Sequence, residues 1–254
     1  MPLGVIVGTG LDEVDDAAWE PLTAHTPYGP VAAFAGELGG RETFLLPRHG
    51  PGHQLPPHRL NYAGNLAALH LLGCERILAC HAVGGIGSGL APGTLCLPHQ
   101  FLDFTCLRAR TLFEPPEQAP AHTDMTEPYC PDLRRRLHGA AEGLGLPLVP
   151  EGVYVCTEGP RFETPAEIHM FALLGATVVG MTAVPEVVFA RELGLCYASV
   201  CLVSNYAAGV TAEPVSEDEI TARMRARRPD VWRLLEAVAA ELPEARDCSC
   251  GGPA

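Results

Sequence analysis

Two short motifs near the N-terminus contain residue types that can hold an anion. Gly8-Thr9-Gly10 comes directly after the apolar run Gly4–Val7. Arg48-His49-Gly50 comes directly after the apolar run Phe44–Pro47. Amides of a glycine turn and a hydroxyl can cradle a phosphate, an arginine matches phosphate oxygens, and a histidine can move a proton near neutral pH. Together the two motifs predict a phosphate site, although each alone is also ordinary for a loop.

Small residues follow two further apolar runs and could form other walls of the same pocket. His81-Ala82-Val83-Gly84-Gly85 extends the run Arg76–Cys80, and Gly180-Met181-Thr182 ends another run. Small side chains allow a ligand to approach the backbone closely. Sites in α/β proteins usually open at the ends of strands, so these residues are candidates for one shared site.

A third group of residues can recognise a flat heterocycle. Phe162-Glu163 stands just before the helix expected over Pro165–Leu174. An aromatic ring can stack on a heterocycle, and a carboxylate can accept hydrogen bonds from ring N–H groups. Asn205 follows the apolar run Tyr197–Val203, and its amide offers one donor and one acceptor to a base edge. For Glu163, a carboxylate that caps the helix is the structural alternative.

The elements that must position these residues alternate between strands and helices. Buried strands are expected at Gly4–Val7, Thr43–Leu46, Arg76–Cys80, Thr94–Pro98, Gly152–Cys156, Thr177–Met181 and Tyr197–Val203. Helices are expected at Leu60–Leu72, Pro131–Gly143, Pro165–Leu174, Pro185–Leu193 and Ser216–Leu242. The proline-rich stretch Phe113–Thr126 is expected to be a long loop, which in a compact domain is often functional. This order predicts an α/β fold with a largely parallel or mixed sheet.

Composition bounds the class of protein. A chain of 254 residues with 47% hydrophobic residues suits one large domain. A formal net charge of −13 argues against nucleic-acid and anionic membrane partners. The chain has no apolar run long enough to span a membrane and no basic leader at its start, so we expect a soluble, cytoplasmic protein. All the basic residues are arginine, which excludes lysine nucleophiles and a Walker-type phosphate loop.

The ten cysteines are expected to be reduced. Most stand singly inside apolar runs, which is typical of buried core thiols. Cys248-Ser249-Cys250 could be a redox pair or a metal clip, but two cysteines without two further ligands nearby make a weak site. We therefore expect a flexible tail over residues 243–254 and no metal site.

Taken together, the ordered motifs resemble the trimeric purine nucleoside phosphorylase and 5′-methylthioadenosine phosphorylase family. The resemblance runs from about Gly4 to Leu242 and implies one nucleoside phosphorylase domain over residues 1–242. It implies a twisted mixed β-sheet surrounded by helices, a homotrimer, and no metal or organic cofactor. Inorganic phosphate and a purine nucleoside would be the two substrates.

The resemblance also assigns roles to individual residues. It implies a phosphate site formed by Thr9, Arg48, His49, His81, Ala82 and Thr182, although the family usually has threonine or asparagine where this chain has His81. It implies a nucleoside site formed by Phe162, Glu163, Met181, Asn205, Ala207 and Glu217, with His122 reaching in from the neighbouring subunit. The residues expected to take part in catalysis are Asn205, Glu163 and His49.

The residues at the expected base site favour 6-oxopurines. Methylthioadenosine phosphorylases typically have serine at the position of Glu163 and an Asp-x-Asp arrangement where this chain has Asn205-Tyr206-Ala207. Glu163 can accept from N1–H, which only the 6-oxo form carries, and the Asn205 amide can donate to O6. The prediction is phosphorolysis of S-methyl-5′-thioinosine, inosine or guanosine in purine salvage, and the chain looks most similar to the methylthioinosine enzymes.

Three alternatives stay open at this point. A 5′-methylthioadenosine phosphorylase would prefer the 6-amino base. A non-catalytic nucleotide-binding domain would need only the glycine turns, and it leaves Arg48, Phe162, Glu163 and Asn205 without a role. A metal-dependent hydrolase would need paired histidines with a neighbouring acid, which the expected helices lack. Glu217 falls near the 5′ group of the nucleoside, and both methylthio and hydroxyl substituents remain possible.

Overall fold

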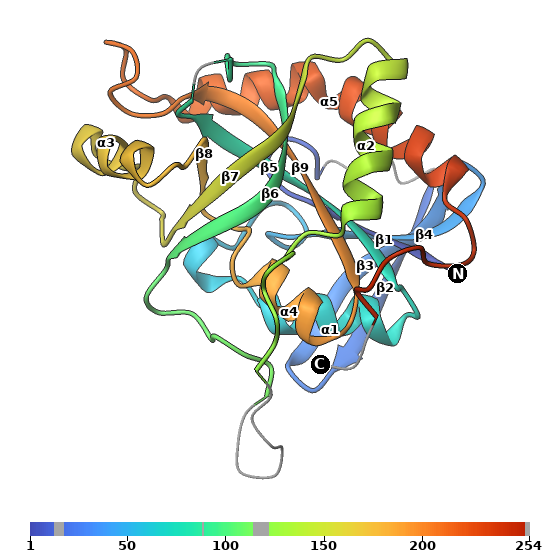
Figure 1. The fold of residues 1–254 in the computed structure, drawn as a ribbon. Coiled ribbons are helices and arrows are strands. Elements are labelled where there is room, and N and C mark those ends of the chain that lie inside the picture. Colours follow the sequence, from blue (N-terminus) through green and yellow to red (C-terminus); the bar gives the residue numbers. More distant parts are fainter. Residues whose placement is uncertain (13–17, 88, 114–121, 252–254) are drawn as a thin grey trace.

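The structure is a computed structural model that describes residues 1–12, 18–87, 89–113 and 122–251 (Figure 1). Its strands are β1 (Leu3–Val7), β2 (Trp19–Thr26), β3 (Gly29–Leu38), β4 (Arg41–Pro47), β5 (Arg76–Gly85), β6 (Leu95–Phe104), β7 (Leu148–Thr157), β8 (Val178–Gly180) and β9 (Cys196–Tyr206). Its α-helices are α1 (Tyr62–Leu71), α2 (Pro131–Gly143), α3 (Pro165–Leu173), α4 (Glu186–Glu192) and α5 (Glu217–Glu241). A short 3-10 helix covers Pro57–Arg59.

The described strands form one mixed sheet in the order β2-β3-β4-β1-β5-β8-β7-β6-β9. β9 also pairs with β5, so the second half of the sheet closes on itself. β1, β4, β5 and β9 run parallel, which brings the carboxyl ends of these four strands to the same edge of the sheet. The prediction of an α/β fold with a mixed sheet among helices is confirmed.

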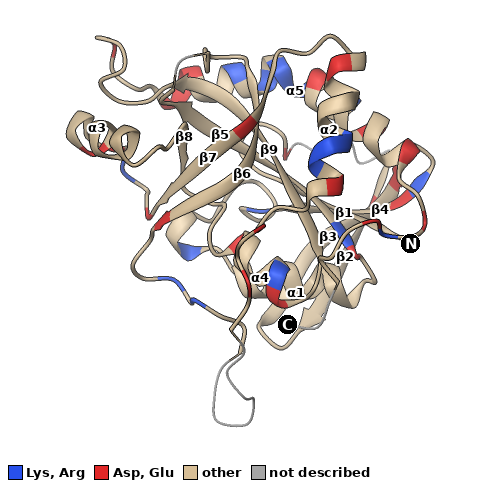
Figure 2. Cartoon of the chain, in the orientation of Figure 1, with Lys and Arg blue, Asp and Glu red and all other residues tan. Residues whose placement is uncertain are grey.

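The strands owe their position to apolar side chains on both faces. Along β1, Ile6 belongs to one cluster of buried residues and Val5 and Val7 belong to another. Successive side chains of a strand point to opposite faces, so the two clusters occupy the two sides of the sheet. Figure 2 shows charged residues mainly on the helices and loops, while the strands of the sheet carry few.

The sequence did not predict the hairpin β2–β3. Its strands pair in an antiparallel ladder from Trp19 opposite Gly36 to Thr26 opposite Gly29. Gly29 has a φ of 104°, a conformation that favours glycine and lets the chain reverse there. Much of β2 is exposed, so it lacks the continuous apolar run by which the buried strands were found.

The expected helices are confirmed, with boundaries shifted by a few residues at most. Proline occupies the first position of α2 and of α3, where a missing N–H costs nothing. A capping box begins α3, because the Thr164 side chain accepts from the Glu167 amide and the Glu167 carboxylate accepts from the Thr164 amide. At α5 only the first half of the expected box forms, between Ser216 and the amide of Glu219.

The expectation of a flexible tail after Leu242 is wrong for the residues that the structure describes. Arg246 forms an ion pair with Glu75 at 3.0 Å and donates to the carbonyl of Gly194 at 2.9 Å. Cys250 is 4% exposed and belongs to one of the two core clusters. These contacts with distant residues hold residues 243–251 on the body, and sequence alone does not reveal them. None of the helices in the described ranges combines the length and the apolar character that a transmembrane span requires.

Candidate active site

One cavity of about 420 Å³ collects nearly all the residues predicted for the site. The predicted residues that line it are Thr9, Arg48, His49, Ala82, Phe162, Glu163, Met181, Thr182, Asn205, Ala207 and Glu217. They come from the loops after β1, β4, β7 and β8, from β5, from the end of β9 and from the first turn of α5. Two predicted residues, His81 and His122, do not line it.

The anion end of the cavity is built around a buried ion pair. Arg48 donates through Nε to Glu186 Oε2 at 2.7 Å and through Nη2 to Glu186 Oε1 at 2.9 Å. Arg48 is 2% exposed and Glu186 is fully buried. Burial opposes the charged form of Arg48, but the carboxylate more than compensates and raises the pKa of the guanidinium. The planar bidentate contact therefore fixes the orientation of Arg48.

Counted over the described residues, one N–H group of Arg48 remains for a ligand. Besides the two donors held by Glu186, one N–H of Nη1 is held by the Cys80 carbonyl at 2.8 Å, and Nη2 lies 3.4 Å from His81 Nε2. A guanidinium has five N–H groups, so the second N–H of Nη1 remains. A Cβ placed on Gly8 would lie 2.8 Å from this nitrogen, so glycine is required for the guanidinium to come this close to the Gly8-Thr9-Gly10 turn.

His81 lies behind the anion end rather than in it, which corrects the prediction that it lines the pocket. It is 2% exposed, and burial lowers its pKa well below the ordinary value, so the ring is neutral. Its Nδ1 lies 2.9 Å from the Thr182 hydroxyl, and its Nε2 faces Arg48. A proton on Nδ1 suits both contacts, because Nε2 then accepts from Arg48 and the Thr182 O–H stays free for the cavity.

His49 presents an acceptor to the same end. Its Nδ1 lies 2.7 Å from the Leu55 carbonyl, which can only accept, so Nδ1 carries the proton. Burial, together with the charge of Arg48, lowers the pKa of His49 to about 4. The ring is neutral at physiological pH, and Nε2 has a lone pair that can accept a proton or a hydrogen bond.

A second group of lining residues, which we call the purine end, carries groups suited to a heterocycle. Glu163 Oε1 accepts from the Thr157 hydroxyl at 2.6 Å, and the carboxylate has further lone pairs for a ligand. Burial raises the pKa of Glu163. The capping box belongs to Thr164 and Glu167, so the capping alternative for Glu163 is wrong and its carboxylate faces the cavity.

Asn205 keeps one free donor and one free acceptor. Its Oδ1 accepts from the Ser204 hydroxyl at 2.9 Å, and its Nδ2 donates to the Tyr206 carbonyl at 2.7 Å. An amide has two N–H groups and two lone pairs, so one of each remains for a ligand. Ala207 stands beside it and presents a methyl group instead of a carboxylate.

The mouth of the cavity is open on one side. The Phe162 ring is 40% exposed, and Glu217 lines the cavity from the first turn of α5. His122 lies elsewhere, in a second hollow that it shares with Arg110, Phe113 and Glu192. The predicted loop Phe113–Thr126 is irregular at residues 122–126, and its part at 114–121 lies outside the described residues.

Sequence reasoning missed the residue that orients Arg48. Glu186 stands in the otherwise apolar stretch Val184-Pro185-Glu186-Val187-Val188, and a lone acid in such a stretch signals a buried partner. Tyr197 was also missed, although its hydroxyl donates to Glu186 Oε1 at 2.7 Å. A tyrosine inside a strand carries no signal of this role.

The cavity thus combines a fixed guanidinium and a histidine acceptor with hydrogen-bonding groups for a flat heterocycle. This is the layout of an enzyme that transfers a group between a heterocycle and an anion. A family model described as the phosphorylase superfamily matches residues 2–240. The chain belongs to the phosphorylase superfamily.

Relatives with known names agree with this assignment. The chain is 43% identical to the 6-oxopurine nucleoside phosphorylase of Pyrococcus furiosus, over 98% of this chain and 96% of that protein. It is 45% identical to the probable S-methyl-5′-thioinosine phosphorylase of Methanothermobacter thermautotrophicus, over 98% and 87% of the two chains. Methylthioadenosine phosphorylase from Schistosoma mansoni in complex with adenine has a similar fold, with a TM-score of 0.88, 32% identity and coverage of 94% and 91%.

Proposed function

We propose that the protein catalyses the phosphorolysis of 6-oxopurine nucleosides in purine salvage. The products are a free purine and ribose 1-phosphate or its 5-methylthio counterpart. The observation that carries the proposal is that Glu163 and Asn205 line one cavity with Arg48, whose guanidinium Glu186 holds from behind. The similarity to relatives named for 6-oxopurine nucleosides and methylthioinosine supports it.

At the anion end, the residues hold phosphate for attack on C1′. The free N–H of Arg48, the Thr182 hydroxyl, the Ala82 amide and the turn at Thr9 donate to its oxygens, and neutral His49 accepts from a protonated one. Glu186 and His81 do not touch phosphate. They act as positioning residues, because they fix the guanidinium and leave the Thr182 hydroxyl free.

At the purine end, the residues stabilise the departing base. A phosphate oxygen bonds to C1′ as the C1′–N9 bond breaks, the electron pair goes to the purine, and N7 takes a proton from solvent. Overall the base gains the proton that hydrogen phosphate loses. Asn205 Oδ1 accepts from N7–H, its free N–H donates to O6, and Glu163 accepts from N1–H. Contacts that improve in the transition state lower the barrier, by several kcal/mol when a few act together. Phosphate is the co-substrate, and the proposal includes no catalytic metal or organic cofactor.

A second candidate is a methylthioadenosine phosphorylase, because the protein from Schistosoma mansoni with the similar fold carries that name. Such an enzyme must accept a hydrogen bond from the 6-amino group. Here the neighbouring position is Ala207, which has no acceptor on its side chain, and the free acceptor of Asn205 is engaged by N7–H. The side chains of this cavity therefore favour the 6-oxo base.

The proposal includes a homotrimer in which His122 of each subunit covers the 5′ end of a neighbour's nucleoside. The exposed ring of Phe162 at the cavity mouth leaves room for such a cover. Leu107, Leu173 and Leu174 are 85%, 76% and 53% exposed, and burial between subunits would remove these apolar side chains from water. Mixing Arg48→Ala with His122→Ala subunits after dissociation should restore part of the activity, whereas a fully active monomer would contradict the trimer.

The reaction class is tested by release of base from inosine, guanosine, methylthioinosine and methylthioadenosine with and without phosphate. Turnover should require phosphate and should be insensitive to a chelator in the assay. Equal release in phosphate-free buffer would indicate a hydrolase and contradict the proposal.

A further inference from the structure

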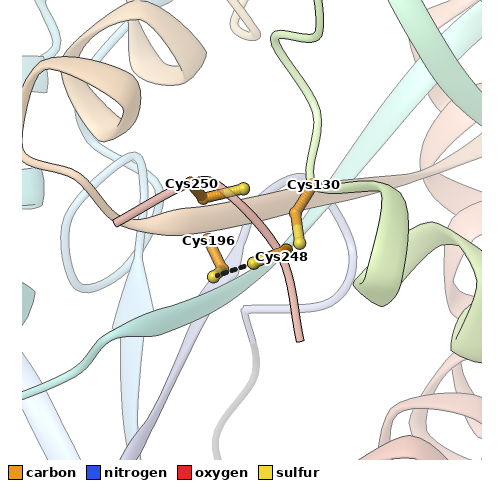
Figure 3. A group of neighbouring side chains, drawn as sticks. All are labelled: Cys130, Cys196, Cys248 and Cys250. Carbon is orange, nitrogen blue, oxygen red and sulfur yellow. Dashed lines mark hydrogen bonds between the residues drawn. The ribbon is translucent and has the colours of Figure 1, made fainter. Parts of the chain in front are cut away.

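Four cysteines from three separate parts of the chain meet far from the cavity. Cys130 caps the start of α2, Cys196 begins β9, and Cys248 and Cys250 lie in the segment that follows α5. All four sulfur atoms lie within 4.8 Å of one another (Figure 3). Sequence reasoning dismissed Cys248 and Cys250 for want of two further ligands, and the fold supplies Cys130 and Cys196.

The spacing of the sulfurs fits a tetrahedral ion. Zinc–sulfur bonds of about 2.3 Å place the four sulfurs of a tetrahedral site about 3.8 Å apart. The Cys196 and Cys248 sulfurs are 3.2 Å apart, and every other pair falls inside the same 4.8 Å limit. The four thiols thus form one compact group rather than two bonded pairs, and all four are free cysteines.

The surroundings are those of a closed structural site. Cys130, Cys196 and Cys250 are buried and Cys248 is half-buried. Four cysteine ligands would complete a tetrahedron and leave no coordination position for a substrate. The Arg246 guanidinium, which is ion-paired with Glu75, donates to the Gly194 carbonyl two residues before Cys196 and so holds the C-terminal segment beside the cysteine group.

We propose that Cys130, Cys196, Cys248 and Cys250 bind one Zn²⁺ ion that fastens the C-terminal segment to the sheet. Zinc with four cysteine ligands is a structural arrangement, and its binding energy adds to the stability of the fold. None of the four cysteines lines the catalytic cavity. Cys196 and Asn205 stand near opposite ends of β9, about 30 Å apart at the rise of a strand. The ion therefore acts on stability and leaves the chemistry unchanged.

Metal analysis and native mass spectrometry of the full-length protein, purified without chelator or added metal, test the site. The expected result is one zinc per chain, released by a mercurial reagent as four thiols react in addition to the exposed Cys106. Replacement by Co²⁺ should give the visible absorption of tetrahedral thiolate ligation. Metal-free protein with disulfides among these cysteines would overturn the proposal, as would metal-free protein with four reduced thiols.

Single-residue variants distinguish the loss of a zinc ligand from the loss of an unrelated cysteine. Cys248→Ser and Cys250→Ser should lose zinc and melt roughly 5–10 °C lower, with kcat/KM at moderate temperature unchanged. The matched control is Cys106→Ser, because Cys106 is an exposed free cysteine outside the group. If Cys248→Ser and Cys250→Ser keep a full equivalent of zinc, these residues are not its ligands and the proposal fails.

Discussion

The two ends of the catalytic cavity are built in different ways. The anion end rests on Arg48, Glu186 and His81, each at most 2% exposed and each tied to the others by polar contacts. The purine end rests on Phe162, which is 40% exposed, and on Asn205, whose contacts are with its own chain neighbours. The anion end is therefore part of the core, whereas the purine end can be altered without disturbing the core.

The sharpest test of this difference is to break the buried pair. Glu186→Ala leaves the Arg48 charge without its partner, so we expect a loss of about 3–5 kcal/mol in the free energy of unfolding. The apparent KM for phosphate should rise much more than that for nucleoside. Denaturant unfolding and steady-state kinetics with each substrate varied measure the two effects.

A double variant separates stability from function at this end. Arg48→Met combined with Glu186→Leu removes both charges and should regain most of the lost stability without regaining phosphate binding. Arg59→Ala, which removes an exposed arginine outside the cavity, is the control and should change neither quantity. If Glu186→Ala is as stable as the wild type, the Arg48–Glu186 pair does not stabilise the core.

At the purine end, a single substitution should change the choice of base and leave the fold intact. Asn205→Asp sets a carboxylate against O6 of a 6-oxopurine and can instead accept from a 6-amino group. A mismatch of this kind costs roughly 1–3 kcal/mol, which is about 10- to 100-fold in relative kcat/KM. Glu163→Ser should also weaken turnover of 6-oxopurines, because N1–H loses its charged acceptor. A ratio of 6-oxo to 6-amino turnover unchanged by Asn205→Asp would show that another residue selects the base.

His49 should make the stability of the anion end depend on pH. Its pKa is lowered from 6.5 to about 4 in the folded protein, so the unfolded chain binds the extra proton first as the pH falls. The contribution of neutral His49 is therefore present above about pH 6.5 and is lost as the pH falls toward 4. Between pH 7 and pH 5 the loss amounts to about 2 kcal/mol.

His49→Asn isolates this term, because asparagine can still donate to the Leu55 carbonyl but does not titrate. The wild type should lose more unfolding free energy than this variant on acidification, by the amount given above. Parallel pH profiles of the two proteins would contradict a neutral, buried His49.

The sequence predicted the parts of the site that lie in local motifs. The residues after β1, β4, β7 and β9 were found because a short polar motif follows each apolar run. Glu186 was missed because it orients Arg48 from a helix far along the chain. The cysteine group was missed for the same reason, since Cys130 and Cys196 meet the tail only in the fold. Patterns in sequence report local geometry, whereas partners distant in the chain become visible only when the sheet brings them together.

The elements of the fold also differ in how well the sequence predicts them. Buried strands were predicted from continuous apolar runs, whereas the half-exposed hairpin β2–β3 was not. His81 was expected to line the phosphate site because it follows an apolar run. Its side chain instead contacts Arg48 and Thr182 from the side away from the cavity. A shift of one residue along a strand reverses the side on which a side chain lies, and family position alone could not settle this.

The cavity is proposed to select a 6-oxopurine nucleoside for phosphorolysis. The most direct measurement is the ratio of kcat/KM for S-methyl-5′-thioinosine to that for 5′-methylthioadenosine, at saturating phosphate, in the wild-type protein. The two substrates differ only at the base, so the 5′ group does not enter the comparison. We predict a ratio of about 10 or more, from the pairing of N1–H with Glu163 and of O6 with Asn205. A ratio below one would contradict the assignment of the base and favour the adenosine enzyme.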